Sequence, residues 1–162
     1  MDQSPIPNAA AARPDHNHER CIAQALLRAE GLCSDSGARL TSLRRAVLMQ
    51  IWQGHAPVKA YDILDRLGDM PGTARPPTVY RALQFLRERG LVHRLESLNA
   101  FVGCARPEQR HEGQFLICTG CGVVREIGVP RITAAVTRAA REAGFTVERQ
   151  TIEVSGRCAR CR

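Results

Sequence analysis

Four cysteines of this 162-residue chain form two C-x-x-C pairs, Cys118 with Cys121 and Cys158 with Cys161. Two thiolates three positions apart on a turn can occupy adjacent vertices around a tetrahedral ion. Two such pairs therefore complete a four-thiolate structural zinc site. Redox pairs and disulfides are the alternatives. Structural zinc is preferred over a thioredoxin-like motif, because that motif needs a single pair at the start of a helix and neither pair opens a clear helix.

A second group of potential ligands is spread more widely along the chain: His93, Cys104, His111 and Glu126. Two imidazoles, one thiolate and one carboxylate can form a tetrahedral zinc site. Spacing alone does not establish this site, because a surface histidine or a buried free cysteine is the commoner outcome for each residue. The remaining cysteines, Cys21 and Cys33, are interpreted as thiols on helix faces.

Composition is compatible with a polyanionic partner, and no enzyme motif is present. The formal net charge is +7, and Lys59 is the only lysine, so arginine carries nearly all the positive charge. Arginine suits phosphate and guanine contacts, although it can equally well solubilise a surface. The chain has no glycine-rich phosphate loop, H-E-x-x-H motif or nucleophile elbow, so we do not expect an enzyme.

Targeting signals are also missing from the sequence. No segment approaches 18 consecutive apolar residues, and the N-terminus has no apolar stretch of signal-peptide type. We therefore expect a cytoplasmic protein in a reducing compartment, where C-x-x-C pairs favour metal binding over disulfides. Residues 1–18 are predicted to be a disordered tail. His16 and His18 in this tail could contact a metal, but a polar tail without a metal is the preferred interpretation.

The elements expected before residue 104 follow the order of a winged helix-turn-helix domain. The first helix should span residues 20–32 and end at Gly31 to Gly37, with an apolar face of Ile22, Leu26, Leu27 and Ala29. A second helix should follow Thr41, a good N-cap residue, and a third should span 59–67. We expect these three helices to pack against one further helix and a β-hairpin, which follow them in the chain.

The fourth helix is the best marked in the sequence. Pro76-Pro77 presets its first turn and Gly90 ends it, with Val79, Leu83 and Leu86 as an apolar stripe. Two strands should follow, LVHRLES and AFVGC. In a winged helix the last helix enters the DNA major groove and the hairpin lies near the backbone.

A smaller α/β domain is expected after Cys104. The segments QFLIC and VVREI read as strands that flank the turn TGCG. Pro130 should open a helix that reaches about Ala143. Its apolar side should contain Ile132, Ala135, Val136 and Ala139. The segment FTVERQTIEV alternates apolar and polar residues and predicts one long strand, which could return the end of the chain to the first C-x-x-C turn.

Taken together, several segments resemble the ferric uptake regulator superfamily, and most closely its zinc uptake regulator branch. These segments are AYDILDRL, PPTVYRALQFLRERGLVHRLES, FLICTGCGVVREI and CARC, and the resemblance covers roughly residues 20–162. It implies an α+β fold: a winged-helix DNA-binding domain over 19–104 with a hinge at its end, and an α/β dimerisation domain over 105–162. It also implies a zinc-responsive repressor whose zinc-loaded homodimer binds AT-rich palindromic operators of zinc-uptake genes.

The resemblance also assigns roles to individual residues. It implies two zinc ions per chain. The structural zinc is assigned to Cys118, Cys121, Cys158 and Cys161. The regulatory zinc is assigned to His93, Cys104, His111 and Glu126. For DNA the resemblance points to Tyr61 and Arg81. Independently of it, Thr78 and Arg75 are expected DNA contacts, and Arg75, Arg44 and Arg45 are expected to contact phosphates.

Departures from the family pattern and rival functions qualify this prediction. Iron-type members usually carry an H-H-D-H stretch before the first C-x-x-C, where this chain has only His111 in QRHEGQFLIC. The family's L-T-P-Q-R reads Leu-Thr-Ser-Leu-Arg here. The rivals are an iron, manganese or peroxide sensor of the same fold, a redox switch that uses one C-x-x-C pair, and a zinc-stabilised protein-interaction module.

Overall fold

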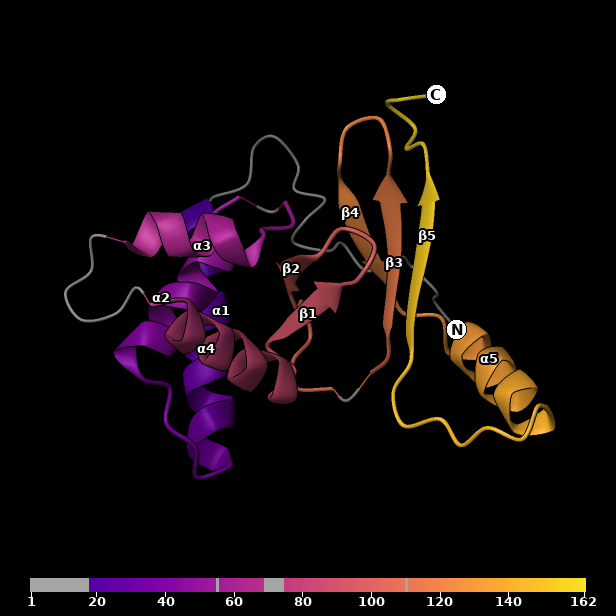
Figure 1. Cartoon of the computed structure of the whole chain (residues 1–162), viewed down its shortest axis with the longest axis horizontal. Helices are drawn as coiled ribbons and strands as arrows, with labels where there is room; N and C mark the ends of the chain where they lie inside the picture. The colour runs from indigo at the N-terminus through magenta and orange to yellow at the C-terminus, as the bar shows by residue number, and fades with distance from the viewer. Residues whose placement is uncertain (1–17, 55, 69–74, 110) are drawn as a thin grey trace. The chain divides into compact units, whose positions relative to one another are not determined.

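The computed structural model describes residues 18–54, 56–68, 75–109 and 111–162 (Figure 1). The chain divides between Arg110 and His111 into two compact units, an N-terminal and a C-terminal one, and each is considered by itself. The expectations for residues 1–17, including His16, lie outside the described residues, whereas His18, predicted to end the tail, is the first residue of a helix. In the described part of the chain, no helix is long and apolar enough to cross a membrane.

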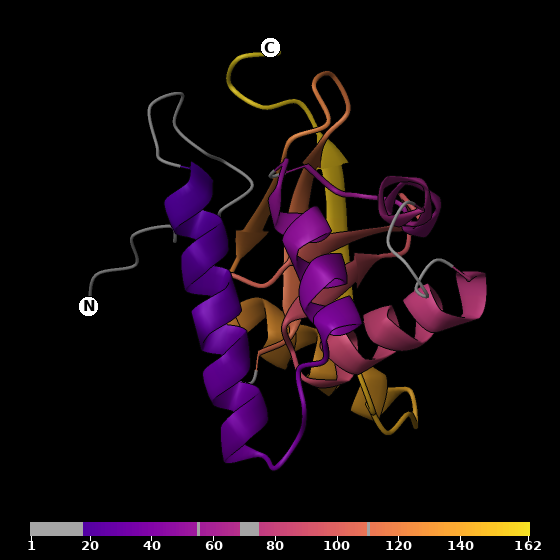
Figure 2. The ribbon, with the colours of Figure 1, turned by 90° about the vertical axis from the view of Figure 1, so that its left-hand side faces the viewer.

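Four helices form most of the N-terminal unit: α1 (His18–Asp35), α2 (Ser42–Trp52), α3 (Ala60–Leu67) and α4 (Pro76–Glu88). The Thr41 side chain accepts a hydrogen bond from the Arg44 backbone N–H and caps α2, as predicted. Proline occupies the first turn of α4, and Val79, Leu83 and Leu86 are buried against the other helices. Figure 2 shows α1 running alongside α2, which it contacts.

The first helix differs from its prediction in length and at one residue of its apolar face, while Ile22, Leu26 and Ala29 pack against the core as predicted. It continues through Gly31 to Asp35, and the chain turns at Gly37, whose φ is +64°. A single glycine inside a helix costs only about 1 kcal/mol, which packing of the rest of the helix offsets. Leu27, predicted to face inward, is 66% exposed. The buried face contains Leu26, Ala29 and Cys33, which recur at helical spacing. Leu27, the residue after Leu26, points away from this face.

A two-stranded hairpin completes this unit, as the sequence predicts. Strand β1 (Val92–Leu95) pairs antiparallel with β2 (Ala100–Gly103), so that Val92 lies opposite Gly103. Two backbone hydrogen bonds join Phe101 of the hairpin to Val58, which lies just before α3. A Cβ at Gly103 would lie 2.3 Å from the Trp52 ring, so this position admits only glycine while the indole stays in place.

The C-terminal unit is a three-stranded sheet with one helix. The strands are β3 (Gly113–Cys118), β4 (Val124–Ile127) and β5 (Thr151–Gly156), and the helix is α5 (Pro130–Glu142). The strand order is β4-β3-β5, in which β4 is antiparallel and β5 parallel to the central β3. Strand β4 returns the chain to the end of the sheet where β3 begins, and the segment that contains α5 then leads to β5 on the other side of β3.

The last strand is shorter than its predicted span of residues 145–154. It begins at Thr151, because its partner β3 begins at Gly113, which pairs with Thr151. Residues 145–150 are not in a strand. There the backbone N–H of Gln150 donates to the Glu112 carboxylate, at 3.0 Å. An alternating pattern indicates which residues can form a strand, but it carries no information on the length of the neighbouring strand.

Candidate metal centres

The four cysteines of the two C-x-x-C pairs come together in the C-terminal unit. Their sulfur atoms all lie within 4.8 Å of one another, and those of Cys121 and Cys158 are 3.7 Å apart. A tetrahedral zinc with Zn–S bonds of about 2.3 Å places its sulfurs about 3.8 Å apart. The donor set therefore fits one zinc ion, in agreement with the prediction from spacing.

The sheet explains how pairs separated by 36 residues meet. Cys118 is the last residue of β3 and lies opposite Gly156 of the parallel β5, so the tail leaves the sheet beside the first pair. Both the backbone N–H and the hydroxyl of Thr119 donate to the Gly156 carbonyl and fix this approach. Gly120 permits it, because a Cβ there would lie 3.0 Å from the Cβ of Cys161 and 3.1 Å from its sulfur.

Backbone N–H groups of the two turns point at the cysteine sulfurs. The N–H of Cys158 donates to the Cys118 sulfur at 3.3 Å. This bond, with others from the N–H groups of Cys121 and Gly120, lowers the pKa of Cys118 to about 6. A hydrogen bond from the Arg160 N–H likewise lowers the pKa of Cys158. These donors stabilise thiolates, the form of cysteine that binds metal.

The surroundings of Cys161, the fourth cysteine of the cluster, favour its neutral thiol. Hydrogen bonds from the Cys161 thiol to the sulfurs of Cys121, Cys158 and Cys118 raise its pKa to about 12. Ionising it would place a further negative charge beside three other sulfurs. A bound dication would remove this repulsion, which is why a four-cysteine cluster suits a metal ion.

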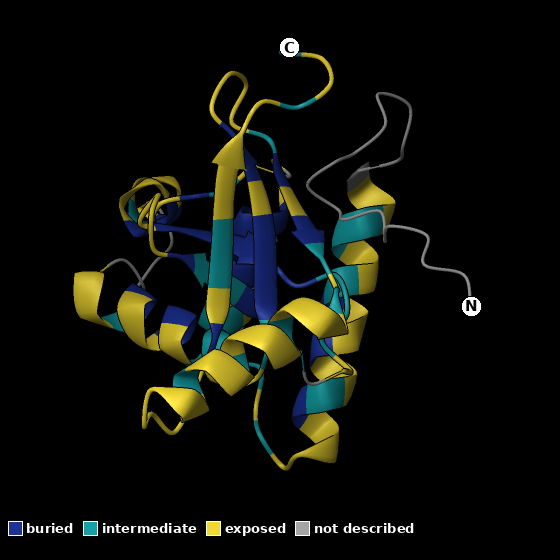
Figure 3. Ribbon diagram, turned by 90° about the vertical axis from the view of Figure 1, so that its right-hand side faces the viewer, coloured by how far each residue is buried: buried dark blue, intermediate teal, exposed yellow. Residues whose placement is uncertain are grey.

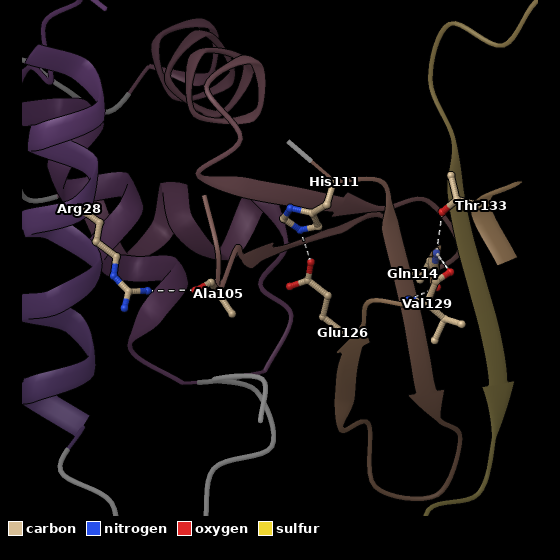
Figure 4. A network of polar contacts seen from close by, with 7 residues as sticks. All are labelled: Arg28, Ala105, His111, Gln114, Glu126, Val129 and Thr133. Atoms are coloured by element: carbon tan, nitrogen blue, oxygen red, sulfur yellow. Dashed lines mark hydrogen bonds and ion pairs between the residues drawn. The ribbon is translucent and has the colours of Figure 1, made fainter. Parts of the chain in front are cut away.

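The C-terminal unit also holds two of the four proposed regulatory ligands. The Nε2 atom of His111 lies 2.5 Å from a carboxylate oxygen of Glu126, as Figure 4 shows. Glu126 belongs to β4 and is only 5% exposed, and the His111 side chain is 16% exposed. The two side chains converge although they lie 15 positions apart in the sequence.

The other two proposed ligands lie in the N-terminal unit. His93 is on β1, and Cys104 directly follows β2 and is 2% exposed. The backbone N–H of Cys104 donates to the Leu91 carbonyl at 3.0 Å, which continues the hairpin by one residue. A ring nitrogen of His93 and the sulfur of Cys104 lie within 4.8 Å of each other. Each unit thus presents one pair of zinc-type donors.

The proposed DNA contacts lie on two helices of the N-terminal unit. Tyr61 on α3 is 70% exposed, and Arg81 on α4 and Arg75 at its N-cap are exposed too. Thr78 is half-buried, and its hydroxyl donates to the Arg75 carbonyl at 2.6 Å.

Two other predicted phosphate contacts are engaged inside the unit. The guanidinium of Arg45 forms an ion pair with Glu30. That of Arg44 stacks on the Phe85 ring, 3.4 Å from its centroid, and donates to the Arg39 carbonyl. These contacts tie α2 to its neighbours. No local pattern predicts the contacts with Glu30 and Phe85, because these partners lie far from the two arginines in sequence.

Comparison with known proteins agrees with this architecture. A profile of the "Ferric uptake regulator family" matches residues 35–155. The "Zinc uptake regulation protein" of Escherichia coli strain K12 is 39% identical over 145 residues, which cover 88% of this chain and 85% of that protein. The protein of the same name from Mycobacterium tuberculosis H37Rv is 31% identical over 132 residues, which cover 80% and 98% of the two chains.

A solved structure extends the likeness to three dimensions. It is described as "Zinc Uptake Regulator Complexed With Zinc AND DNA" and superimposes with a TM-score of 0.81. The two chains are 38% identical, and the match covers 86% of this chain and 94% of that one.

Proposed function

This chain belongs to the ferric uptake regulator family, and we infer that it is a zinc-responsive transcriptional repressor. The observation that carries this inference is the distribution of zinc-type donors. The four-cysteine cluster lies in one unit, and a separate histidine–cysteine pair lies in the hairpin of the winged-helix unit. A protein with donors beside its DNA-binding elements can couple metal occupancy to DNA binding, whereas a purely structural zinc cannot.

We assign the two donor groups to two zinc ions per chain. The four-cysteine cluster is the structural site, because its ligands join the tail to β3 inside one unit. The regulatory site takes His93 and Cys104 from the hairpin and His111 and Glu126 from the C-terminal unit. Zinc bound there would join both units in a single tetrahedral coordination sphere.

The two donor pairs themselves couple zinc binding to DNA binding. Without a metal the two donor pairs have no strong attraction for each other, so the units are free to sample many orientations. The orientation with both pairs converged is the one we propose to be DNA-competent. In it, the two α4 helices of a homodimer are spaced to match operator half-sites. The two-fold symmetry of the dimer requires a palindromic operator. We propose that these operators are AT-rich and control zinc-uptake genes, and that the protein acts in the cytoplasm.

An exposed apolar surface in the C-terminal unit supports the homodimer. No residue of α5 is buried within the chain, and Figure 3 shows the helix largely exposed. Leu116 and Val154, neighbours across the β3–β5 ladder, are 40% and 51% exposed. Further exposed apolar side chains are Ile132, Val136, Phe145 and Val147. Leu116 and Val154 lie side by side, and an interface with another chain would cover such adjacent apolar side chains.

The donor chemistry favours zinc over the metals of the rival sensors. Cys104 supplies a thiolate, and soft sulfur ligands select zinc over manganese or iron bound by oxygen and nitrogen. Only His111 stands where iron-type members carry a histidine-rich stretch.

The test is zinc-dependent DNA binding by the full chain. A palindrome selected from a random pool in the presence of zinc would be titrated with zinc-replete and gently chelated protein, alongside a scrambled duplex. Zinc per chain would be counted in parallel. We expect two zinc ions and tight specific binding, falling to one zinc and weak binding after chelation. One retained zinc with binding indifferent to chelation would remove the regulatory site.

A matched pair of cysteine variants assigns the effect to a residue. Cys104→Ser should abolish the zinc response and keep the four-cysteine zinc. Cys21→Ser, which alters a half-buried thiol on α1, should leave the zinc response unchanged. Equal behaviour of the two variants would contradict the assignment of Cys104.

A further inference from the structure

The segment that follows Cys104 is held against the first helix of its own unit. The Arg28 guanidinium on α1 donates from Nη1 to the Ala105 carbonyl at 3.0 Å, as Figure 4 shows. Its Nε atom lies 3.4 Å from the Glu108 carboxylate. The backbone N–H of Gln109 donates to the Arg106 carbonyl and closes a turn. Residues 105–109 therefore form an ordered extension of the N-terminal unit.

We propose that Arg28 is a positioning residue for the zinc response, because it restricts the segment that leads from Cys104 toward His111. This inference rests on the proposed function, in which these two residues bind the same zinc. Arg28 touches none of the four ligands in the described contacts. It acts on the backbone between two of them, through one carbonyl and one carboxylate.

The physical basis is the entropy of the connecting chain. With residues 105–109 held on α1, most of the six residues that separate Cys104 from His111 are already ordered. Releasing them would increase the number of conformations that must be given up when the four ligands converge. The restraint thus lowers the zinc concentration at which the two units become fixed.

The measurement is a zinc titration of operator binding by the full-length homodimer, followed by fluorescence anisotropy of labelled DNA. For Arg28→Gln we expect the zinc concentration at half-maximal binding to rise about three- to tenfold, the range of one or two partly exposed polar contacts. Glu108→Gln should produce a smaller rise, because the Ala105 carbonyl keeps its donor. The double variant should resemble Arg28→Gln alone.

Operator affinity at saturating zinc distinguishes positioning from a DNA contact. A positioning role leaves this affinity and its salt dependence unchanged, since the ordering is complete once zinc is bound. A phosphate contact by Arg28 would lower the affinity at all zinc concentrations and flatten the salt dependence, and that result would overturn the proposal. Arg141→Gln removes the same charge from the exposed end of α5 and should leave the titration unchanged.

Failure of this inference can be told apart from failure of the proposed function. If the unmodified protein responds to zinc and Arg28→Gln responds at the same concentration, the positioning role is wrong and the repressor function stands. If the unmodified protein shows no zinc response, both fail. Retention of one zinc per chain after mild chelation and an unchanged melting temperature would show that Arg28→Gln remains folded.

Discussion

Gly120 is the residue that lets the two cysteine pairs approach each other. Its missing side chain leaves room for the Cβ and sulfur of Cys161, which would lie 3.0 and 3.1 Å from an added Cβ. The sequence places this glycine in the CTGCG turn but does not reveal the close approach, which depends on where the C-terminal tail returns. The spacing of the cysteines predicts the four ligands, because the two cysteines of each C-x-x-C pair lie on the same short turn.

We predict that Gly120→Ala weakens the four-cysteine zinc site. The methyl group would push Cys161 by a few tenths of an ångström from its place in the tetrahedron. Zinc transfer to a chromophoric chelator should become about tenfold faster, as is typical when the surroundings of a metal ligand are altered. Gly156→Ala is the matched control, because no atom lies within 4 Å of an added Cβ there. Equal transfer rates for the two variants would contradict the steric explanation.

The proposed DNA contacts Arg81 and Arg75 yield a second prediction for single residues. Arg81→Ala should cost about 1–3 kcal/mol of operator binding and relax specificity at one base position, as expected for loss of a guanine contact. Arg75→Ala should instead weaken binding to all sequences and flatten the salt dependence. Competition titrations against single-base operator variants measure both effects. An Arg81→Ala protein that kept full discrimination would remove this assignment.

Helix α5 illustrates what an amphipathic pattern can and cannot indicate. The predicted apolar side of Ile132, Ala135, Val136 and Ala139 exists, but it faces away from the sheet and stays exposed. The helix is attached by polar contacts instead. Gln114 of β3 donates to the Val129 carbonyl and to the Thr133 hydroxyl, and the Thr137 hydroxyl donates to Gln150. Periodicity identifies an apolar face, while the identity of its partner depends on other elements.

We predict that a charge on this face separates the dimer. Val136→Glu would bury a carboxylate at the proposed interface and should weaken dimerisation by tenfold or more, since an unpaired buried charge costs at least about 1.4 kcal/mol. Ala134→Glu places the same group on the opposite, also exposed, side of α5. Sedimentation equilibrium of both variants is the measurement. A dimer of unchanged strength in Val136→Glu would exclude α5 from the interface.

The predicted bounds of α1 and β5 are wrong for one reason: contacts with distant segments set these bounds. Local signals define α4 well, because Pro76-Pro77 and Gly90 act within the chain segment itself. They fail for the end of α1, where packing of Cys33 and its neighbours outweighs Gly31, and for the start of β5, which is set by β3. The approach of His111 to Glu126 has no local signal, since it depends on β3 and β4 pairing. Only the family resemblance led us to expect that His111 and Glu126 lie close together.

At the scale of the whole molecule, the chain consists of two units, and each holds one pair of the donors that we propose for the regulatory zinc. Our account holds that zinc binding and operator binding both favour the orientation in which the donor pairs converge. Two ligands that favour the same conformation must strengthen each other's binding by an equal factor. Zinc sensing then requires no direct contact between metal and DNA.

The most direct test is the zinc affinity of the regulatory site measured with and without operator DNA, in protein that retains its four-cysteine zinc. Competition against a calibrated chelator would give both dissociation constants. We predict that operator tightens zinc binding by the same factor by which zinc tightens operator binding, about five- to 150-fold for a typical coupling. Identical zinc affinities in the presence and absence of operator would contradict the account.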